Sequence, residues 1–411
     1  MHSTLRAAVA FAGAATLALS LSGCGGDSSA PPAQRSTTFG EVSGTDDSGT
    51  NGTYSWKGVP YAKAPVGELR WKAPVDPDAW SQPKATQAYG NACAQYGRLY
   101  GPGTNNRYDA TIGSTLGQSL GAEDCLYLNI WQPASANKAL PVLVFIHGGS
   151  NITGYTADPL YDGAALAVKA NAVVVTVNYR LGLFGFLNMA QLKTGANAND
   201  DSGNFAILDL IKALTFVNRN IANFGGDPGN VTVMGQSAGA VNLYALMVSP
   251  LVVNASPKLM HRVVPVSGGI SLATNLPAGS LPTLAPASAY AVQAALLLQN
   301  LVIADGLATD ATSANAYIAT QTSAQIAAYV RSKSAAQILA IVVTKLAALG
   351  AGGSGPIPDG TVMPTDAIAA INAGQYTKVP VLAANTRDEG KLFPTFLALA
   401  PALGGVSGRL L

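Results

Sequence analysis

The spacing of apolar residues along this chain changes at about residue 140. Between Thr37 and Trp80, short apolar runs are broken by glycine and proline, a pattern typical of short strands joined by turns. From Leu140 onward, unbroken apolar runs appear, and such runs are typical of strands that a sheet buries on both faces. We expect strands of this kind at residues 141–146, 172–178, 231–234, 262–266 and 379–384.

Helical patterns lie between several of these runs. Residues 203–224 carry apolar side chains at three- and four-residue spacing, and Gly225 and Gly226 follow, which predicts a helix that ends there. The Asn- and Asp-rich residues 196–202 before it predict a loop. The alanine-rich residues 285–349 predict weakly amphipathic helices. Alternating strands and helices favour an α/β fold with a mostly parallel central sheet and helices on both faces.

The first 23 residues predict a cleaved export signal rather than part of the fold. Arg6 precedes the apolar stretch 7–21, which is too short to span a bilayer comfortably. Leu-Ser-Gly followed by Cys24 resembles the lipobox of bacterial lipoproteins, in which the cysteine is lipidated; an ordinary signal with an incidental cysteine is the alternative. Residues 24–36, rich in Gly, Ser, Pro and Ala, predict a flexible tether, which leaves residues 37–411 as the folded domain.

The three cysteines are consistent with export. Lipidation of Cys24 leaves Cys93 and Cys125 to pair, and their disulfide closes a loop that is worth about 3–4 kcal/mol in the loop-entropy model. An oxidising compartment permits such a bond. We therefore expect the mature chain in the bacterial cell envelope, on the periplasmic or outer surface, held to a membrane only by its lipid, or otherwise secreted.

Composition argues against two further classes of protein. The formal net charge of +2 leaves no electrostatic footprint for nucleic acid. Charged residues make up only 11% of the chain, which favours a compact and apolar domain. No run beyond the export signal is long and apolar enough to predict a transmembrane helix. The remaining length suits either one large α/β domain or two domains.

The most informative motif is Gly-Gln-Ser-Ala-Gly, with Ser237 at its centre. An apolar strand pattern precedes it and a helical pattern follows, which is the layout of a nucleophile elbow that presents a serine for acyl transfer. The same five-residue pattern recurs around Ser119, but polar loop residues surround that copy, so we interpret Ser119 as part of a loop.

A second motif, His-Gly-Gly-Ser at residues 147–150, follows the strand expected at 141–146. Glycines at the carboxyl end of a parallel strand let backbone N–H groups point into a crevice, where an oxyanion could bind. Together with the N–H of Ala238, these groups would form an oxyanion hole. An ordinary turn is the alternative, and the presence of Ser237 favours the oxyanion hole.

Further segments accompany these motifs in a fixed order along the chain. They are 58–62 (GVPYA), 65–71 (PVGELRW), 123–130 (EDCLYLNI), 178–182 (NYRLG), 220–228 (NIANFGGDP), 267–268 (SG) and 385–390 (NTRDEG). Together they cover about residues 37–393 and resemble the type-B carboxylesterase family of α/β-hydrolases, which includes esterases, cholinesterases and catalytically silent adhesion proteins. The resemblance implies the α/β-hydrolase fold.

The resemblance also implies roles for individual residues. Ser237 is the expected nucleophile, and Glu389, rather than its neighbour Asp388, is the expected triad carboxylate. The expected oxyanion donors are the N–H groups of Gly149, Ser150 and Ala238. Ser150 stands where the family more often has a third glycine, and glutamine at 236 replaces the more usual glutamate.

Other residues that match the family are implied to be structural. Cys93 and Cys125 match its first loop disulfide. The pairs Arg70 with Glu123 and Arg180 with Asp209 resemble its buried salt bridges, and a buried ion pair marks packing more often than catalysis. Nothing in the sequence implies a metal or an organic cofactor.

The catalytic histidine is the one component without a candidate. In α/β-hydrolases it follows the acid along the chain, but none of the residues after Glu389 is a histidine. His2 lies in the export signal, His261 precedes the strand expected at 262–266 and should lie at its far end, and His147 is used by the family to shape the oxyanion loop. The chain is therefore expected to lack the family's C-terminal strand and histidine loop.

The leading hypothesis is a serine carboxylesterase acting on a small-molecule ester through an acyl-enzyme, with catalysis impaired by the missing histidine. Two alternatives remain open. One is a non-catalytic binding protein at the cell surface, built on the same fold. The other is a truncated gene product on the same fold, from a decayed gene that yields no stable protein.

Overall fold

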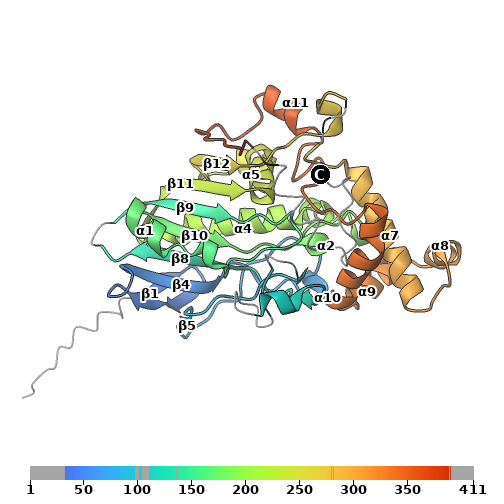
Figure 1. The fold of residues 1–411 in the computed structure, drawn as a ribbon, viewed down its shortest axis with the longest axis horizontal. Helices are drawn as coiled ribbons and strands as arrows, with labels where there is room; N and C mark the ends of the chain where they lie inside the picture. The colour runs from blue at the N-terminus through green and yellow to red at the C-terminus, as the bar shows by residue number, and fades with distance from the viewer. Residues whose placement is uncertain are drawn as a thin grey trace, which may run out of the picture. The chain divides into compact units, whose positions relative to one another are not determined.

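A mixed sheet forms the centre of the fold. In the computed structural model, which describes residues 33–97, 101–103, 111–135, 138–278, 280, 282–387 and 389, seven strands follow the order β12-β11-β9-β10-β8-β4-β3 (Figure 1). These strands are β3 (Thr45–Asp47), β4 (Thr53–Pro60), β8 (Tyr127–Pro133), β9 (Leu140–Ile146), β10 (Val173–Val177), β11 (Gly226–Gln236) and β12 (Arg262–Val266). Small sheets add β1 (Gln34–Thr37), β2 (Gly40–Ser43), β5 (Lys84–Ala85), β6 (Gln95–Tyr96) and β7 (Ser119–Leu120).

The two parts of the sheet differ in strand direction. Strands β12, β11, β9 and β10 are parallel to one another, whereas β10 pairs with β8, β8 with β4 and β4 with β3 in antiparallel fashion. The α/β-hydrolase prediction is confirmed, although the sheet is less dominated by parallel strands than expected. The short strands expected between Thr37 and Trp80 supply much of its antiparallel part.

Helices cover both faces of the sheet. In the pairing of β10 with β8, Val174 lies opposite Trp131 and Val175 opposite Ile130, so the two pairs point to opposite faces. The first pair packs with helix α1 (Ala164–Ala170), and the second belongs to the main core together with α4 (Phe205–Asn220). This two-sided burial explains the unbroken apolar run of β10.

The helix predicted at 203–224 is confirmed as α4, which continues into a 3₁₀ turn and ends at Gly225, a residue with φ of 80°. The loop prediction for 196–202 is wrong in part, because residues 198–201 form the short helix α3 (Ala198–Asp201). The side chain of Asn197 caps it by accepting from the N–H groups of Asn199 and Asp200. The remaining helices before residue 285 are α2 (Gly182–Gly185), α5 (Ala238–Val248) and α6 (Pro250–Val253).

The alanine-rich segment forms a cluster of helices, α7 (Ala287–Ala304), α8 (Ala311–Ala319), α9 (Ser323–Arg331) and α10 (Ala335–Ile341), followed by α11 (Ala367–Asn372) (Figure 1). The expectation of no further membrane-length run needs correction, since α7 is long and apolar enough to cross a bilayer by length and composition alone. Several of its side chains are nevertheless buried against the other helices, so it serves as a core helix: Leu297, Leu298, Leu301 and Val302.

The strand expected at residues 379–384 is present only as isolated parallel bridges beside β12, at Val381 and Ala384. The ladder is interrupted at Pro265 of β12, which has no N–H group to donate to the carbonyl of Leu382 between the two bridges. Val381 and Leu382 expose 48% and 68% of their surface.

The predicted export signal, the predicted tether up to residue 32, Asp388 and the residues after Glu389 lie outside the described residues. The tether prediction is wrong for residues 33–36, because Ala33 is buried in the core and Gln34–Thr37 form β1.

Candidate active site

Ser237 lies at a sharp turn between β11 and α5. Its φ of 55° and ψ of −124° place it in a region that residues with a side chain rarely adopt, and its N–H donates to the carbonyl of Val266 in β12 (2.8 Å). Because β11 and β12 are parallel, this bond holds the serine at the carboxyl edge of the sheet. The strained, half-buried turn is the geometry that the elbow motif predicted.

Glycine is required on both sides of this serine because the backbones approach very closely. A Cβ atom on Gly235 would lie 2.3 Å from the carbonyl oxygen of Gly239. A Cβ atom on Gly239 would lie 2.1 Å from the carbonyl oxygen of Ile146 at the end of β9. Such contacts do not occur between real atoms, so both glycines are needed for α5 to start where it does.

The second copy of the pattern has none of this geometry. Ser119 lies exposed in the two-residue strand β7, opposite Tyr96 of β6, and no helix follows it. It is thus part of a short strand rather than the expected loop. The structure supplies no turn that would present its hydroxyl as a nucleophile.

The loop after β9 passes directly beside the nucleophile. A Cβ atom on Gly148 would lie 3.0 Å from the Cβ of Ser237. Among the described residues, the backbone N–H groups of Gly149 and Ser150 have no hydrogen-bond acceptor. The N–H of Ala238, the first residue of α5, is one of the donors that a helix N-terminus leaves unused. Three candidate donors therefore lie around Ser237, where they could bind an oxyanion.

Glu389 is attached to the same edge of the sheet through Ser267, the residue directly after β12. The hydroxyl of Ser267 donates to Oε1 of Glu389, and the N–H of Thr386 donates to the same oxygen (2.8 Å). The Ser267 bond holds the pKa of Glu389 below its ordinary value, and the Thr386 bond adds to this effect. Sequence reasoning gave Ser267 no role, although its position after a parallel strand was a usable signal.

The two described histidines do not form hydrogen bonds with Ser237. His147 is 1% exposed, stacks on Tyr179 with 4.6 Å between ring centroids, and donates from Nδ1 to the carbonyl of Gly148 (2.8 Å). Burial lowers its pKa to about 4, so it is neutral at neutral pH. His261 precedes β12 and accepts from the N–H of Val231 (3.3 Å), at the end of the sheet opposite Ser237.

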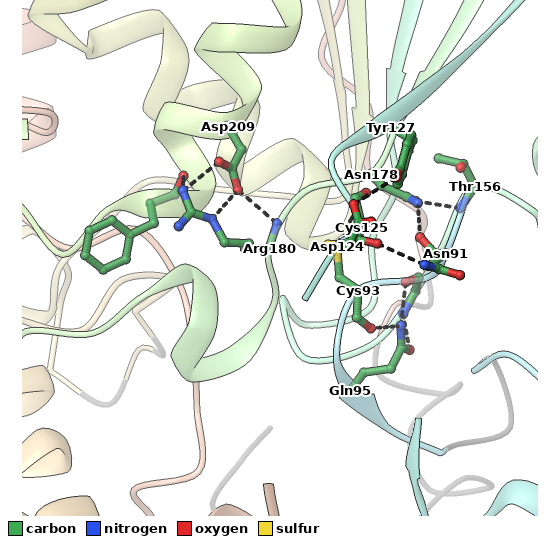
Figure 2. Close-up of a disulfide and its surroundings, with 12 residues drawn as sticks. Asn91, Cys93, Gln95, Asp124, Cys125, Tyr127, Thr156, Asn178, Arg180 and Asp209 are labelled. Atoms are coloured by element: carbon green, nitrogen blue, oxygen red, sulfur yellow. Dashed lines mark hydrogen bonds and ion pairs between the residues drawn. A yellow bond between two sulfur atoms is a disulfide. The ribbon is translucent and has the colours of Figure 1, made fainter. Parts of the chain in front are cut away.

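The disulfide between Cys93 and Cys125 has an S–S distance of 2.06 Å (Figure 2). Two residues after Cys93, the side chain of Gln95 is buried and makes several hydrogen bonds. Its Nε2 donates to the carbonyls of Cys93 and Gly154 (both 3.0 Å), and its Oε1 accepts from the hydroxyl of Thr153 (2.8 Å). The disulfide loop is thereby connected to the end of the oxyanion loop.

Two ion pairs expected to be structural are present. Arg180 and Asp209, almost fully buried, form two side-chain bonds of 2.7 and 2.8 Å, and Asp209 also accepts from the N–H of Arg180 (Figure 2). Arg70 bonds both oxygens of Glu123 and donates to backbone carbonyls at the end of α9. Each pair connects separate parts of the fold, and neither contacts Ser237.

Among the described residues, no group of three or more His, Cys, Asp or Glu side chains is arranged to hold a metal ion. The groups that the structure brings together at this edge of the sheet can be named. They are a strained serine hydroxyl, three N–H donors around it, and a carboxylate held at the same edge of the sheet.

Comparison with known proteins identifies relatives over most of the chain. A model of the Carboxylesterase family matches residues 31–405. The para-nitrobenzyl esterase of Bacillus subtilis is 34% identical over 359 residues, which are 87% of this chain and 63% of that esterase. The fumonisin B1 esterase of Sphingopyxis macrogoltabida is 33% identical over 375 residues, which are 91% of this chain and 59% of that enzyme. The chain thus spans less than two thirds of the length of either relative.

Solved structures agree with these matches. A para-nitrobenzyl esterase structure superimposes with a TM-score of 0.67 at 31% identity and covers 91% of this chain and 69% of its own. A Geobacillus stearothermophilus carboxylesterase has a TM-score of 0.68 at 30% identity, with 92% and 68% covered.

Proposed function

The chain belongs to the carboxylesterase family, and we propose that it hydrolyses small carboxylic esters through an acyl-enzyme on Ser237. The observation that carries this proposal is the strained serine with unpaired N–H groups of Gly149 and Ser150 beside it. Attack by the hydroxyl on an ester carbonyl produces an oxyanion, which these N–H groups and that of Ala238 would stabilise. Loss of the alcohol leaves the acyl-enzyme, and water then releases the acid.

Glu389 is proposed as the carboxylate that orients a histidine for this chemistry. A serine hydroxyl is a weak nucleophile until a base takes its proton, and neither His147 nor His261 is arranged to do so. We propose that the 411-residue chain, assayed as it stands, acylates Ser237 slowly. A serine site without one triad member still retains roughly 10³–10⁴-fold catalysis over water from its oxyanion hole and substrate binding.

Two relatives are named after different esters. One is called a para-nitrobenzyl esterase and another a fumonisin B1 esterase. For this chain we propose a small-molecule ester without narrowing the class further, and no cofactor takes part in the proposed mechanism.

Labelling of Ser237 tests the proposal. A fluorophosphonate probe, followed by peptide mass spectrometry, should mark Ser237 in the 411-residue chain, and Ser237→Ala should abolish the label. Ser119→Ala is the matched control and should label normally. Free imidazole should accelerate ester hydrolysis if a base is the missing component, because it can take the proton that neither described histidine is placed to accept.

A non-catalytic binding role on the same fold is the competing proposal, and it is favoured by one observation. Neither described histidine forms a hydrogen bond with Ser237. A folded chain that resists the fluorophosphonate, and whose hydrolysis of simple esters does not respond to imidazole, would contradict the acyl-transfer proposal and favour this second role.

We further propose that Cys24 carries a lipid and anchors the chain in the cell envelope. The Leu-Ser-Gly-Cys sequence supports lipidation, and the disulfide between Cys93 and Cys125 is consistent with an oxidising compartment. Expression of the full-length chain with Cys24→Ser should move the protein from the membrane fraction to the soluble fraction of the envelope. An unchanged distribution would contradict the anchor.

A further inference from the structure

A pair of buried asparagine side chains joins the oxyanion loop to the helix that starts at the nucleophile. Asn151 follows Ser150 in the loop, and Asn242 lies in α5, five residues after Ser237. Nδ2 of Asn242 donates to Oδ1 of Asn151 (2.8 Å), and Nδ2 of Asn151 donates back to Oδ1 of Asn242 (3.2 Å). The two side chains are 2% and 0% exposed, so water does not compete for these bonds.

The loop that this pair holds is strained. Ser150 and Asn151 have φ of 55° and 57°, two consecutive residues in the left-handed region. Asparagine visits this region more readily than most residues, whereas serine does so at a cost in free energy. Such a conformation persists only where surrounding contacts enforce it. The candidate oxyanion donors therefore need support from outside the loop.

Gln95 supplies support on the other side of the loop. Its Oε1 accepts from Thr153 Oγ1 (2.8 Å) and from the N–H of Gly154 (3.0 Å), and it is 1% exposed. Gln95 fixes the end of the loop to the disulfide region, but it has no hydrogen bond to α5. Among the described side chains, the asparagine pair thus supplies the hydrogen bonds that connect this loop directly to α5.

We infer that Asn151 and Asn242 are positioning residues, which set the distance between the Ser237 hydroxyl and the oxyanion donors at Gly149 and Ser150. This inference rests on the proposed acyl transfer at Ser237. A buried amide pair adds little net stability compared with apolar side chains of similar volume, so its main consequence is a fixed geometry. A rigid first turn of α5 transmits that geometry to the serine.

The test uses the full chain with Asn242→Leu, which keeps the branching of the asparagine side chain and removes both hydrogen bonds of the pair, together with the interaction of Asn242 with the Tyr179 side chain. The first-order rate of fluorophosphonate reaction at Ser237 should fall roughly tenfold to a hundredfold, because a small displacement of oxyanion donors is costly to the rate. The dissociation constant of the reversible probe complex should stay within about twofold of the parent's value. The contacts that bind the probe equally well before and during the reaction are retained. Amide hydrogen exchange of a peptide covering 149–154 should become faster.

Asn220→Leu is the matched control. Asn220 is also buried, its Nδ2 donates to the carbonyl of Phe216 (2.9 Å), and it lies at the end of α4, away from Ser237. This variant should lower the midpoint of urea unfolding without changing the reaction rate at Ser237 or exchange at 149–154. An equal change in all three measurements by both variants would show a general loss of stability and would overturn the inference.

A double variant separates positioning from packing. Asn151→Gly with Asn242→Leu leaves no unpaired buried amide, and glycine tolerates the φ of residue 151, so the urea midpoint should return toward that of the parent. The reaction at Ser237 should stay slow, since the connection is still absent. Recovery of both stability and rate would show that the pair only fills space. The double variant also decides the question if Asn242→Leu alone fails to fold.

Failure of the proposed function gives a different result. If Ser237 of the parent chain does not react with the probe, the proposed acyl transfer is wrong for this chain, but the exchange measurement still decides the structural claim. Unchanged exchange at residues 149–154 in Asn242→Leu would overturn the positioning role whatever the reactivity of Ser237.

Discussion

The two halves of the candidate site are held in different ways. The nucleophile half, Ser237 with the oxyanion loop, lies where β9, β11 and α5 meet and contains backbone conformations that side chains rarely adopt. Buried side chains hold it from two directions. The acid half is the exposed Glu389, which is held by one side-chain bond from Ser267 and one backbone bond from Thr386.

This difference indicates where rigidity is built into the fold. A strained turn needs close packing and several buried hydrogen bonds, so the nucleophile half should be costly to alter. An exposed carboxylate needs only to be oriented, and its bonds compete with water. Changes in the first half should therefore alter stability, and changes in the second should alter mainly titration and rate.

The largest effect is expected for Gly239→Ala. The added Cβ would lie 2.1 Å from the carbonyl oxygen of Ile146, so β9 or α5 must move, and we expect a loss of about 4 kcal/mol in the free energy of unfolding. Urea unfolding measures this loss. Gly49→Ala is the control, because a Cβ there meets no described atom within 4 Å. Similar losses in both variants would show that the close approach is not a real constraint.

Removal of the disulfide should come next. Replacing Cys93 and Cys125 by alanine frees the loop in the unfolded chain and should lower the free energy of unfolding by about 3–4 kcal/mol. Because Gln95 connects this loop to Gly154, exchange of the oxyanion-loop amides should also become faster. Cys24→Ser is the matched control and should change neither quantity. A stability loss without faster exchange would show that the disulfide stabilises the fold but does not support the oxyanion loop.

Acid should destabilise the nucleophile half through His147. Its pKa is lowered from 6.5 to about 4 by burial, so the unfolded chain binds a proton at a higher pH than the folded chain does. The resulting penalty is absent above pH 6.5, grows as the pH falls, and reaches about 3 kcal/mol near pH 4.

The difference in unfolding free energy between the parent and His147→Gln, followed from pH 7 to pH 4, isolates this penalty. The parent should lose stability relative to the variant over that range. His261→Gln should leave the pH dependence of the parent nearly unchanged, since His261 is only partly buried and the carboxylate of Asp227 counteracts part of the lowering of its pKa by burial. A difference that stays constant with pH would contradict the buried, neutral state of His147.

The smallest effect on stability is expected in the acid half. Ser267→Ala removes the hydroxyl that holds the pKa of Glu389 down, so this pKa should rise toward its ordinary value while the urea midpoint stays unchanged. A carboxyl titration by NMR measures the pKa. Ser271→Ala, a nearby serine whose hydroxyl has no described bond to Glu389, is the control. A large loss of stability in Ser267→Ala would remove the contrast between the two halves.

Much of the fold could be predicted from local spacing. The periodicity of residues 203–224 predicted α4, and unbroken apolar runs predicted β9, β10 and β12 closely. The run at 379–384 was overestimated because its own apolar pattern does not report that Pro265 of the neighbouring β12 interrupts the ladder. Helix α3 was missed because the same Asn and Asp residues that favour loops also cap helices.

The sequence by itself determined the elements around Ser237, because glycine spacing, strand pattern and helix pattern all act within a few residues of chain. Only the tertiary structure decided which distant side chains meet there. The bond between Ser267 and Glu389 spans 122 positions, and that between Asn151 and Asn242 spans 91. Such contacts depend on how parallel strands bring separate loops to one edge of the sheet, and no local periodicity specifies them.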